Sequence, residues 1–88
     1  MDEREVDERE TEAFEVIRKV FAGELEREAP VEAGQHLRDL ALDSMEVTVL
    51  MVELKNHFRV RLDPADAIEV ATVADLARLV ATRAQAAT

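Results

Sequence analysis

Residues 39–58 of the chain read DLALDSMEVTVLMVELKNHF, with a serine at the start of a run rich in apolar residues. The run predicts a helix that begins at Asp43 or Ser44 and ends near His57, with Asp43 as its N-cap. The first N–H groups of a helix have no partners inside it and carry the positive end of its dipole, so they favour a bound phosphate. The serine hydroxyl is therefore placed where a phosphodiester-linked group would be stabilised.

This predicted helix is apolar on two sides. One stripe holds Val47, Leu50, Met51, Leu54 and Phe58, and the opposite one holds Met45, Val49, Val52 and Asn56. Such a helix is either buried on both sides or presents one side to a partner. In a chain of 88 residues we favour a partner on the second stripe; the alternative is that this stripe packs under the preceding loop.

The rest of the chain also favours helices. Phe14, Ile17, Phe21 and Leu25, with Val20 beside them, predict a helix from Asp7 or Thr11 to Arg27, which Pro30 would end. A long connection follows, from Ala29 to Leu42. We expect its own apolar side chains to hold it in place: Val31, Leu37, Leu40 and Leu42.

After the central helix, the stretch Arg59–Leu62 is read as a loop because no other strand is predicted to pair with it. Asp63 and Pro64 start a short helix through Glu69. Thr72 caps a last helix, whose inner face would be formed by Val73, Leu76, Leu79 and Val80. The prediction is an all-α four-helix bundle with three longer helices and one short one.

Composition limits the possible functions. The chain has no cysteine, which excludes a disulfide scaffold, a thiol nucleophile and cysteine-ligated zinc. Its net charge of -9 disfavours nucleic acid and anionic membranes as partners. Without a membrane span or signal peptide in the sequence, we expect a cytoplasmic protein. We expect a charged tail over residues 1–10, a folded domain over 11–84 and a frayed end over 85–88.

Catalytic patterns are absent from the sequence. No Ser-His-Asp triad, glycine-rich phosphate loop or calcium-loop pattern is found, and His36 and His57 have no carboxylates at a convincing metal-site spacing. Lys55, Arg59 and Arg61 are interpreted as a solvated basic rim. We therefore expect a protein that is not an enzyme and binds no metal.

The order of these features, from Phe14 to Val80, resembles the acyl carrier protein family. The core of the resemblance is Asp39-Leu40-Ala41-Leu42-Asp43-Ser44-Met45, which is similar to the family's leucine-glycine-x-aspartate-serine-leucine signature. Two positions depart from it. Met45 replaces a leucine of similar volume, and Ala41 replaces a glycine, which would strain the loop only if φ is positive there.

The resemblance implies a function for this serine. Ser44 would accept 4′-phosphopantetheine from coenzyme A, transferred by a phosphopantetheinyl transferase that uses magnesium, and Asp43 would be recognised beside the metal of that enzyme. The arm would hold acyl groups as thioesters. Partners would be acyl-loading, condensing and tailoring enzymes, which a monomeric carrier would meet in turn.

We expect the docking face for these partners on the central helix. Met45, Val49 and Val52 would form its apolar part, and Glu46 and Glu53 would steer basic partners. Fatty-acid carriers usually have more acids along this helix, whereas here Val49 and Lys55 occupy positions that are often acidic. A specialised pathway, such as polyketide or related secondary metabolism, therefore fits better than fatty-acid synthesis.

Two alternatives stay open. A peptidyl carrier would hold amino acids, although Asp43 before the serine favours the acyl type. A small helical adaptor would bind partners through the central helix with Ser44 as an unmodified residue.

Overall fold

A computed structural model describes residues 3–27 and 30–86, and it is built from helices. They are α1 (Glu3–Ala22), α2 (Ser44–Phe58), α3 (Pro64–Glu69) and α4 (Val73–Ala86), with one turn of 3₁₀ helix, η1 (Leu37–Leu40). Within the described ranges there is no strand, only an isolated bridge between His36 and Thr72. The predicted all-α bundle of three longer helices and one short one is confirmed.

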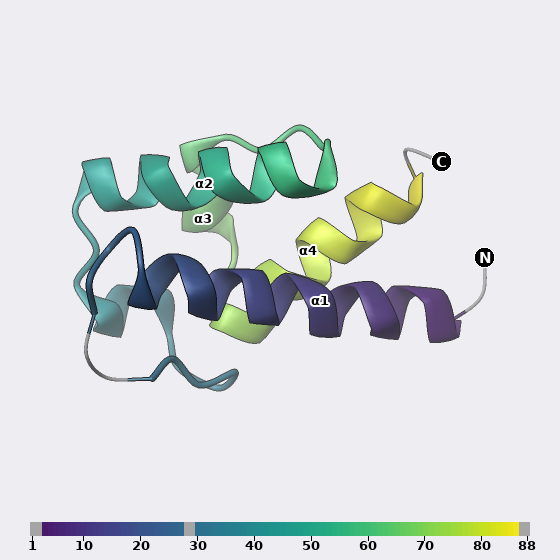
Figure 1. Cartoon of the computed structure of the whole chain (residues 1–88), viewed down its shortest axis with the longest axis horizontal. Coiled ribbons are helices and arrows are strands. Elements are labelled where there is room, and N and C mark those ends of the chain that lie inside the picture. Colours follow the sequence, from purple (N-terminus) through teal and green to yellow (C-terminus); the bar gives the residue numbers. More distant parts are fainter. Residues whose placement is uncertain (1–2, 28–29, 87–88) are drawn as a thin grey trace.

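The helices lie around one apolar core (Figure 1). Helix α1 runs along the longest dimension, α2 lies antiparallel beside it, and α4 packs along α1 more extensively than along any other helix. Helix α3 contacts α2. The end of α2 that carries Ser44 lies at the same end of the molecule as the loop after α1, opposite the start of α1.

The core has contributions from three helices and the loops. Four α1 residues at helical spacing are buried: Ala13, Ile17, Val20 and Phe21. They form one core cluster with Leu50, Met51 and Leu54 of α2 and Val73, Leu76, Ala77, Val80 and Ala84 of α4. Phe14 and Leu25, predicted on this face, are only half-buried. Ala13, which was not predicted on this face, is fully buried instead.

Helix α1 differs from its prediction at both ends. It begins at Glu3, so most of the residues expected as a charged tail form its first turns, and it ends at Ala22 rather than Arg27. At the other end the chain turns back on the helix, since Leu25 N–H donates to Val20 O at 3.0 Å and Arg27 N–H to Phe21 O at 2.7 Å.

The other three helices begin where their caps predicted. Asp43 precedes α2, Asp63 precedes α3 with Pro64 as its first residue, and Thr72 precedes α4 and accepts a hydrogen bond from Asp75 N–H at 3.1 Å. Helix α4 continues to Ala86, into the segment expected to fray; residues 87–88 lie outside the described residues. Arg59–Leu62 is a loop, as predicted.

The connection before α2 is held by side chains and by backbone hydrogen bonds. Val31 and Leu37 are buried, and Leu40 and Leu42 pack against the core, as predicted. Backbone hydrogen bonds to the α3–α4 connection were not predicted: Leu37 N–H donates to Ala71 O at 2.9 Å, and Val73 N–H donates to Gln35 O at 3.0 Å. These bonds fix the loop that leads to Ser44.

Candidate functional site

Ser44 is the first residue of α2 and is exposed. The Asp43 carboxylate before it accepts a hydrogen bond from Glu46 N–H at 2.7 Å, and the Glu46 carboxylate accepts one from Asp43 N–H at 3.3 Å. This reciprocal capping box fixes where α2 begins. Thr48, one turn later, donates its hydroxyl proton to Ser44 O at 2.8 Å, so it binds the backbone and not the serine hydroxyl.

The residue three positions before Ser44 has a left-handed backbone. Ala41 has φ 51° and ψ 46°, a conformation that costs an L-residue about 1–2 kcal/mol. It is one of three non-glycine residues with positive φ among those the structure describes, with Glu26 and Arg59. The family's usual glycine at this position would adopt the same turn without that cost.

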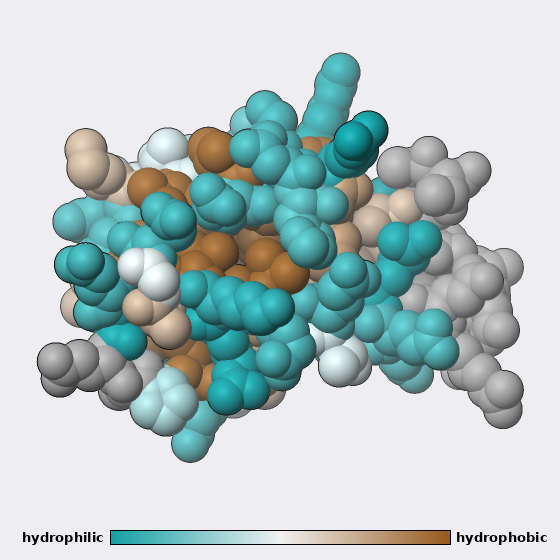
Figure 2. Space-filling model, viewed as in Figure 1, coloured by the Kyte–Doolittle hydropathy of each residue, from teal (hydrophilic) through white to brown (hydrophobic). Residues whose placement is uncertain are grey.

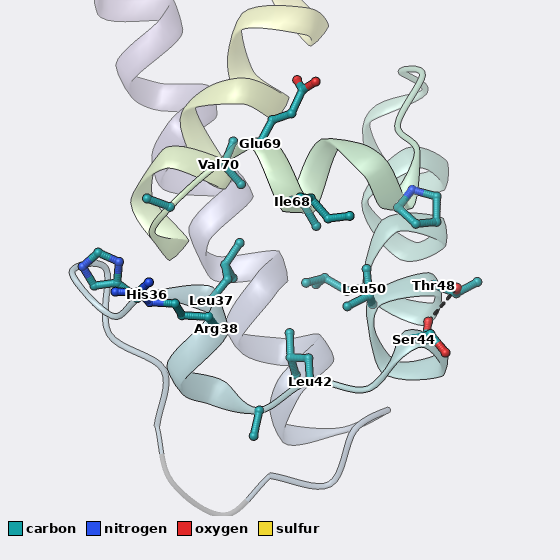
Figure 3. A pocket seen from close by; sticks show the side chains of 15 residues that line it. His36, Leu37, Arg38, Leu42, Ser44, Thr48, Leu50, Ile68, Glu69 and Val70 are labelled. Atoms are coloured by element: carbon teal, nitrogen blue, oxygen red, sulfur yellow. Dashed lines mark hydrogen bonds between the residues drawn. The ribbon is translucent and has the colours of Figure 1, made fainter.

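A large cavity opens beside Ser44 (Figure 3). Its volume is about 980 Å³, at the upper end of the range for small-molecule pockets. In Figure 3, Ser44 and Thr48 lie on the α2 side, His36 and Arg38 lie on the opposite side, and Leu42 and Leu50 lie between them. Ile68, Glu69 and Val70 contribute from α3 and the residue after it. Most of the lining residues are apolar, so the cavity fits an aliphatic or weakly polar chain.

The predicted docking residues differ in their exposure. Met45 is 75 % exposed and Val52 is 44 % exposed, whereas Val49 is half-buried against the core. Glu53 is exposed. Glu46 is engaged inside the protein: besides the capping box, it accepts hydrogen bonds from the Arg27 guanidinium at 2.9 Å. Only Glu53 of the two predicted acids therefore presents an unshared charge to a partner.

Sequence reasoning missed one apolar residue near this face. Ile68 of α3 is 85 % exposed and also lines the cavity beside Ser44. The short helix α3 has no buried residue, so its hydrophobic pattern gave no sign of which side faces solvent. On the face drawn in Figure 2, other apolar side chains gather between polar borders over the seam between α1 and α2.

Charged side chains away from Ser44 pair with one another on the surface. Hydrogen bonds from the Arg83 guanidinium lower the pKa of the Asp66 carboxyl, and the same pairing raises the pKa of Arg83. His57 lies 3.3 Å from a carboxylate oxygen of Glu12 on the surface. In the part of the chain that the structure describes, no three metal-ligating side chains come together, and no helix is both long and apolar enough to cross a bilayer.

Comparison with known proteins decides the family. The family model described as "Phosphopantetheine attachment site" matches residues 15–80, which is more than half of the chain. The chain belongs to this family. Its domain is the site at which 4′-phosphopantetheine is covalently attached, so the protein is a carrier of such an arm. No curated protein and no solved structure matches the chain.

The residues that match the family model include those around the start of α2. The matched span includes the serine, its cap and both sides of the cavity. Carrier domains of this kind are generally not catalytic, and they generally interact with a phosphopantetheinyl transferase and with acyl-handling enzymes. An exposed hydroxyl at a helix N-terminus, next to an apolar cavity, has the two features that a tethered arm requires: access for the transferase and space for a cargo.

Proposed function

We propose that Ser44 is the attachment site and that the protein is a discrete acyl carrier of polyketide or related secondary metabolism. The observation that carries this proposal is the exposed Ser44 at the first turn of α2, beside the cavity of about 980 Å³. Ser44 is also the one serine in the chain. When bound, the arm supplies a thiol that holds an acyl group as an activated thioester.

The chain's own residues would bind and orient the arm. The free N–H groups at the start of α2 favour the negative phosphodiester, and Asp43 keeps the helix start fixed while remaining accessible to the transferase. The apolar residues of the cavity, including Leu42, Leu50 and Ile68, would shield the cargo from water. Asp43 before the serine supports acyl rather than aminoacyl cargo.

The attachment site is tested by incubating the protein with coenzyme A, magnesium and a promiscuous phosphopantetheinyl transferase. Intact-mass spectrometry should show the mass of one arm on the wild type and none on Ser44→Ala. Thr48→Val is the matched control, because it removes the neighbouring exposed hydroxyl and should still be modified. A wild type that gains no mass would favour the helical adaptor instead.

We also propose that the outer side of α2 forms the docking face, with the exposed Met45 and Val52 and the half-buried Val49 as its apolar part and Glu53 as its free acid. Met45 and Val52 are exposed although they are large and apolar, and such residues mark interaction sites when they lie together. In this arrangement Glu46 acts mainly within the protein, since Arg27 and the capping box hold its carboxylate.

The docking face is tested with Val52→Ala and a matched valine on another helix. Val16→Ala removes the same two methyl groups from a half-buried position on α1. We expect Val52→Ala to raise the KM of the transferase for the carrier, while Val16→Ala lowers thermal stability and leaves this KM unchanged. The docking proposal is wrong if Val52→Ala lowers only stability.

A further inference from the structure

Arg27 connects the end of α1 to the start of α2. Its backbone N–H donates to Phe21 O at 2.7 Å, which ties the residue to the buried end of α1. Its guanidinium donates to both carboxylate oxygens of Glu46 at 2.9 Å and to Leu40 O at 2.9 Å. A longer bond, at 3.5 Å, reaches Ala41 O.

These contacts lie on both sides of Ser44 in the sequence. Leu40 and Ala41 belong to the turn before the serine, and Glu46 belongs to the first turn of α2, which begins at Ser44. One planar guanidinium therefore fixes the left-handed turn, the capping box and their relative position. A lysine would supply one point charge and could not donate along several directions of a rigid plane.

We propose that Arg27 is a positioning residue for transfer of the arm to Ser44, an inference that rests on the proposed function. In the transfer, the Ser44 oxygen forms a bond to the phosphorus of the pantetheine phosphate. The bond from that phosphorus to the bridging oxygen of the coenzyme A pyrophosphate breaks, adenosine 3′,5′-bisphosphate leaves with this oxygen, and the serine proton passes to the transferase or to solvent. Arg27 touches none of these atoms; it keeps the hydroxyl where the transferase can meet it.

A second arginine provides a matched control. Arg83 donates to the Asp66 carboxylate at 2.8 Å and 3.1 Å and to Arg61 O at 2.9 Å. Asp66 is the third residue of α3 and accepts a hydrogen bond from Asp63 N–H, as Glu46 does from Asp43 in α2. Arg27 and Arg83 thus make the same kind of contact at the starts of two helices, but only the Arg27 contact lies at Ser44.

The experiment compares Arg27→Gln with Arg83→Gln in the full chain. KM and kcat for arm transfer are measured with the carrier as the varied substrate, at a temperature where both variants are folded. Amide hydrogen exchange is followed over residues 40–47. Arg27→Lys is the second variant, for use if Arg27→Gln does not fold.

We expect Arg27→Gln to raise KM about fivefold with kcat unchanged, because a smaller fraction of the carrier has the competent conformation. Exchange over residues 40–47 should become faster. Arg83→Gln should change KM less than about twofold although it also loses stability. Arg27→Lys should lie between the wild type and Arg27→Gln.

Two results would overturn the inference while leaving the proposed function intact. One is an equal KM for Arg27→Gln and Arg83→Gln. The other is a raised KM for Arg27→Gln without faster exchange, which would mean that Arg27 contacts the transferase directly. Failure of the wild type to gain the arm is a different result, since it would overturn the proposed function and this inference with it.

Discussion

Replacing Ala41 by glycine should stabilise the protein. Ala41 has φ 51° and ψ 46°, so its β-carbon is held in the left-handed region. That conformation costs about 1–2 kcal/mol for an L-residue, and glycine adopts it without the steric cost. Glycine also gives the unfolded chain more freedom, which costs about 0.4–1 kcal/mol. The difference is a gain of about 0.5–1 kcal/mol in the free energy of unfolding.

Thermal unfolding followed by circular dichroism measures this gain. In a domain of this size, about 0.5–1 kcal/mol corresponds to a rise in Tm of about 3–6 °C. Arg59→Gly should have the same sign, because Arg59 has φ 55° at the end of α2. Ala65→Gly is the opposite control: Ala65 is exposed within α3, where glycine costs about 0.5–1 kcal/mol.

One result in particular would contradict a strained backbone at Ala41. If Ala41→Gly lowers Tm as much as Ala65→Gly does, the alanine is not strained and the loop does not require a left-handed residue. If Arg59→Gly raises Tm and Ala41→Gly does not, backbone strain is present at the end of α2 but not in the turn before Ser44.

Three further changes test the caps and the core. Asp43→Ala removes the N-cap of α2 and should cost about 1 kcal/mol in a denaturant titration, whereas Asp43→Ser should cost much less. Hydrogen bonds from Arg83 lower the pKa of Asp66, so this carboxylate stabilises the fold at pH values above its ordinary pKa of 3.8, and this stabilisation is lost as the pH falls through the lowered pKa. The Tm advantage of wild type over Asp66→Asn should therefore shrink as the pH falls below about 4. Ile17→Val, in the fully buried core, should cost about 1 kcal/mol of unfolding free energy, whereas Ile68→Val at an exposed position should change it by less than about 0.5 kcal/mol.

Local chemistry explains which parts of the fold were predictable. The caps Asp43, Asp63 and Thr72 act on N–H groups within three residues, so their effect can be read from short stretches of sequence. The apolar spacing of α2 and α4 likewise predicted most of their buried faces, although Leu79 of α4 is only half-buried. Helix α1 was predicted less well at its ends, because its acidic first turns lack an apolar face and its last residues turn back on the helix.

The site was predictable only in part, for a related reason. Ser44 and Asp43 were singled out from their neighbours in the sequence, and their role in attachment stays a prediction. Arg27 lies nineteen residues from Glu46, and no local pattern pairs them. The cavity depends on how α3 approaches α2, which follows from tertiary packing. The left-handed turn at Ala41 was considered from the family's glycine, but only the backbone angles establish it.

The pairing of Arg27 with Glu46 also bears on how partners would recognise this carrier. Both side chains are partly shielded, at 33 % and 23 % exposed, and their charges offset each other at short range. Of the two predicted acids, only Glu53 then contributes an unpaired negative charge to the docking face. Lys55, which is also exposed and lies two residues later, offsets this charge with a positive one. Long-range steering requires an excess of one charge, which this face lacks. Under the proposed function, recognition of α2 therefore depends mainly on contact with the exposed apolar residues Met45 and Val52.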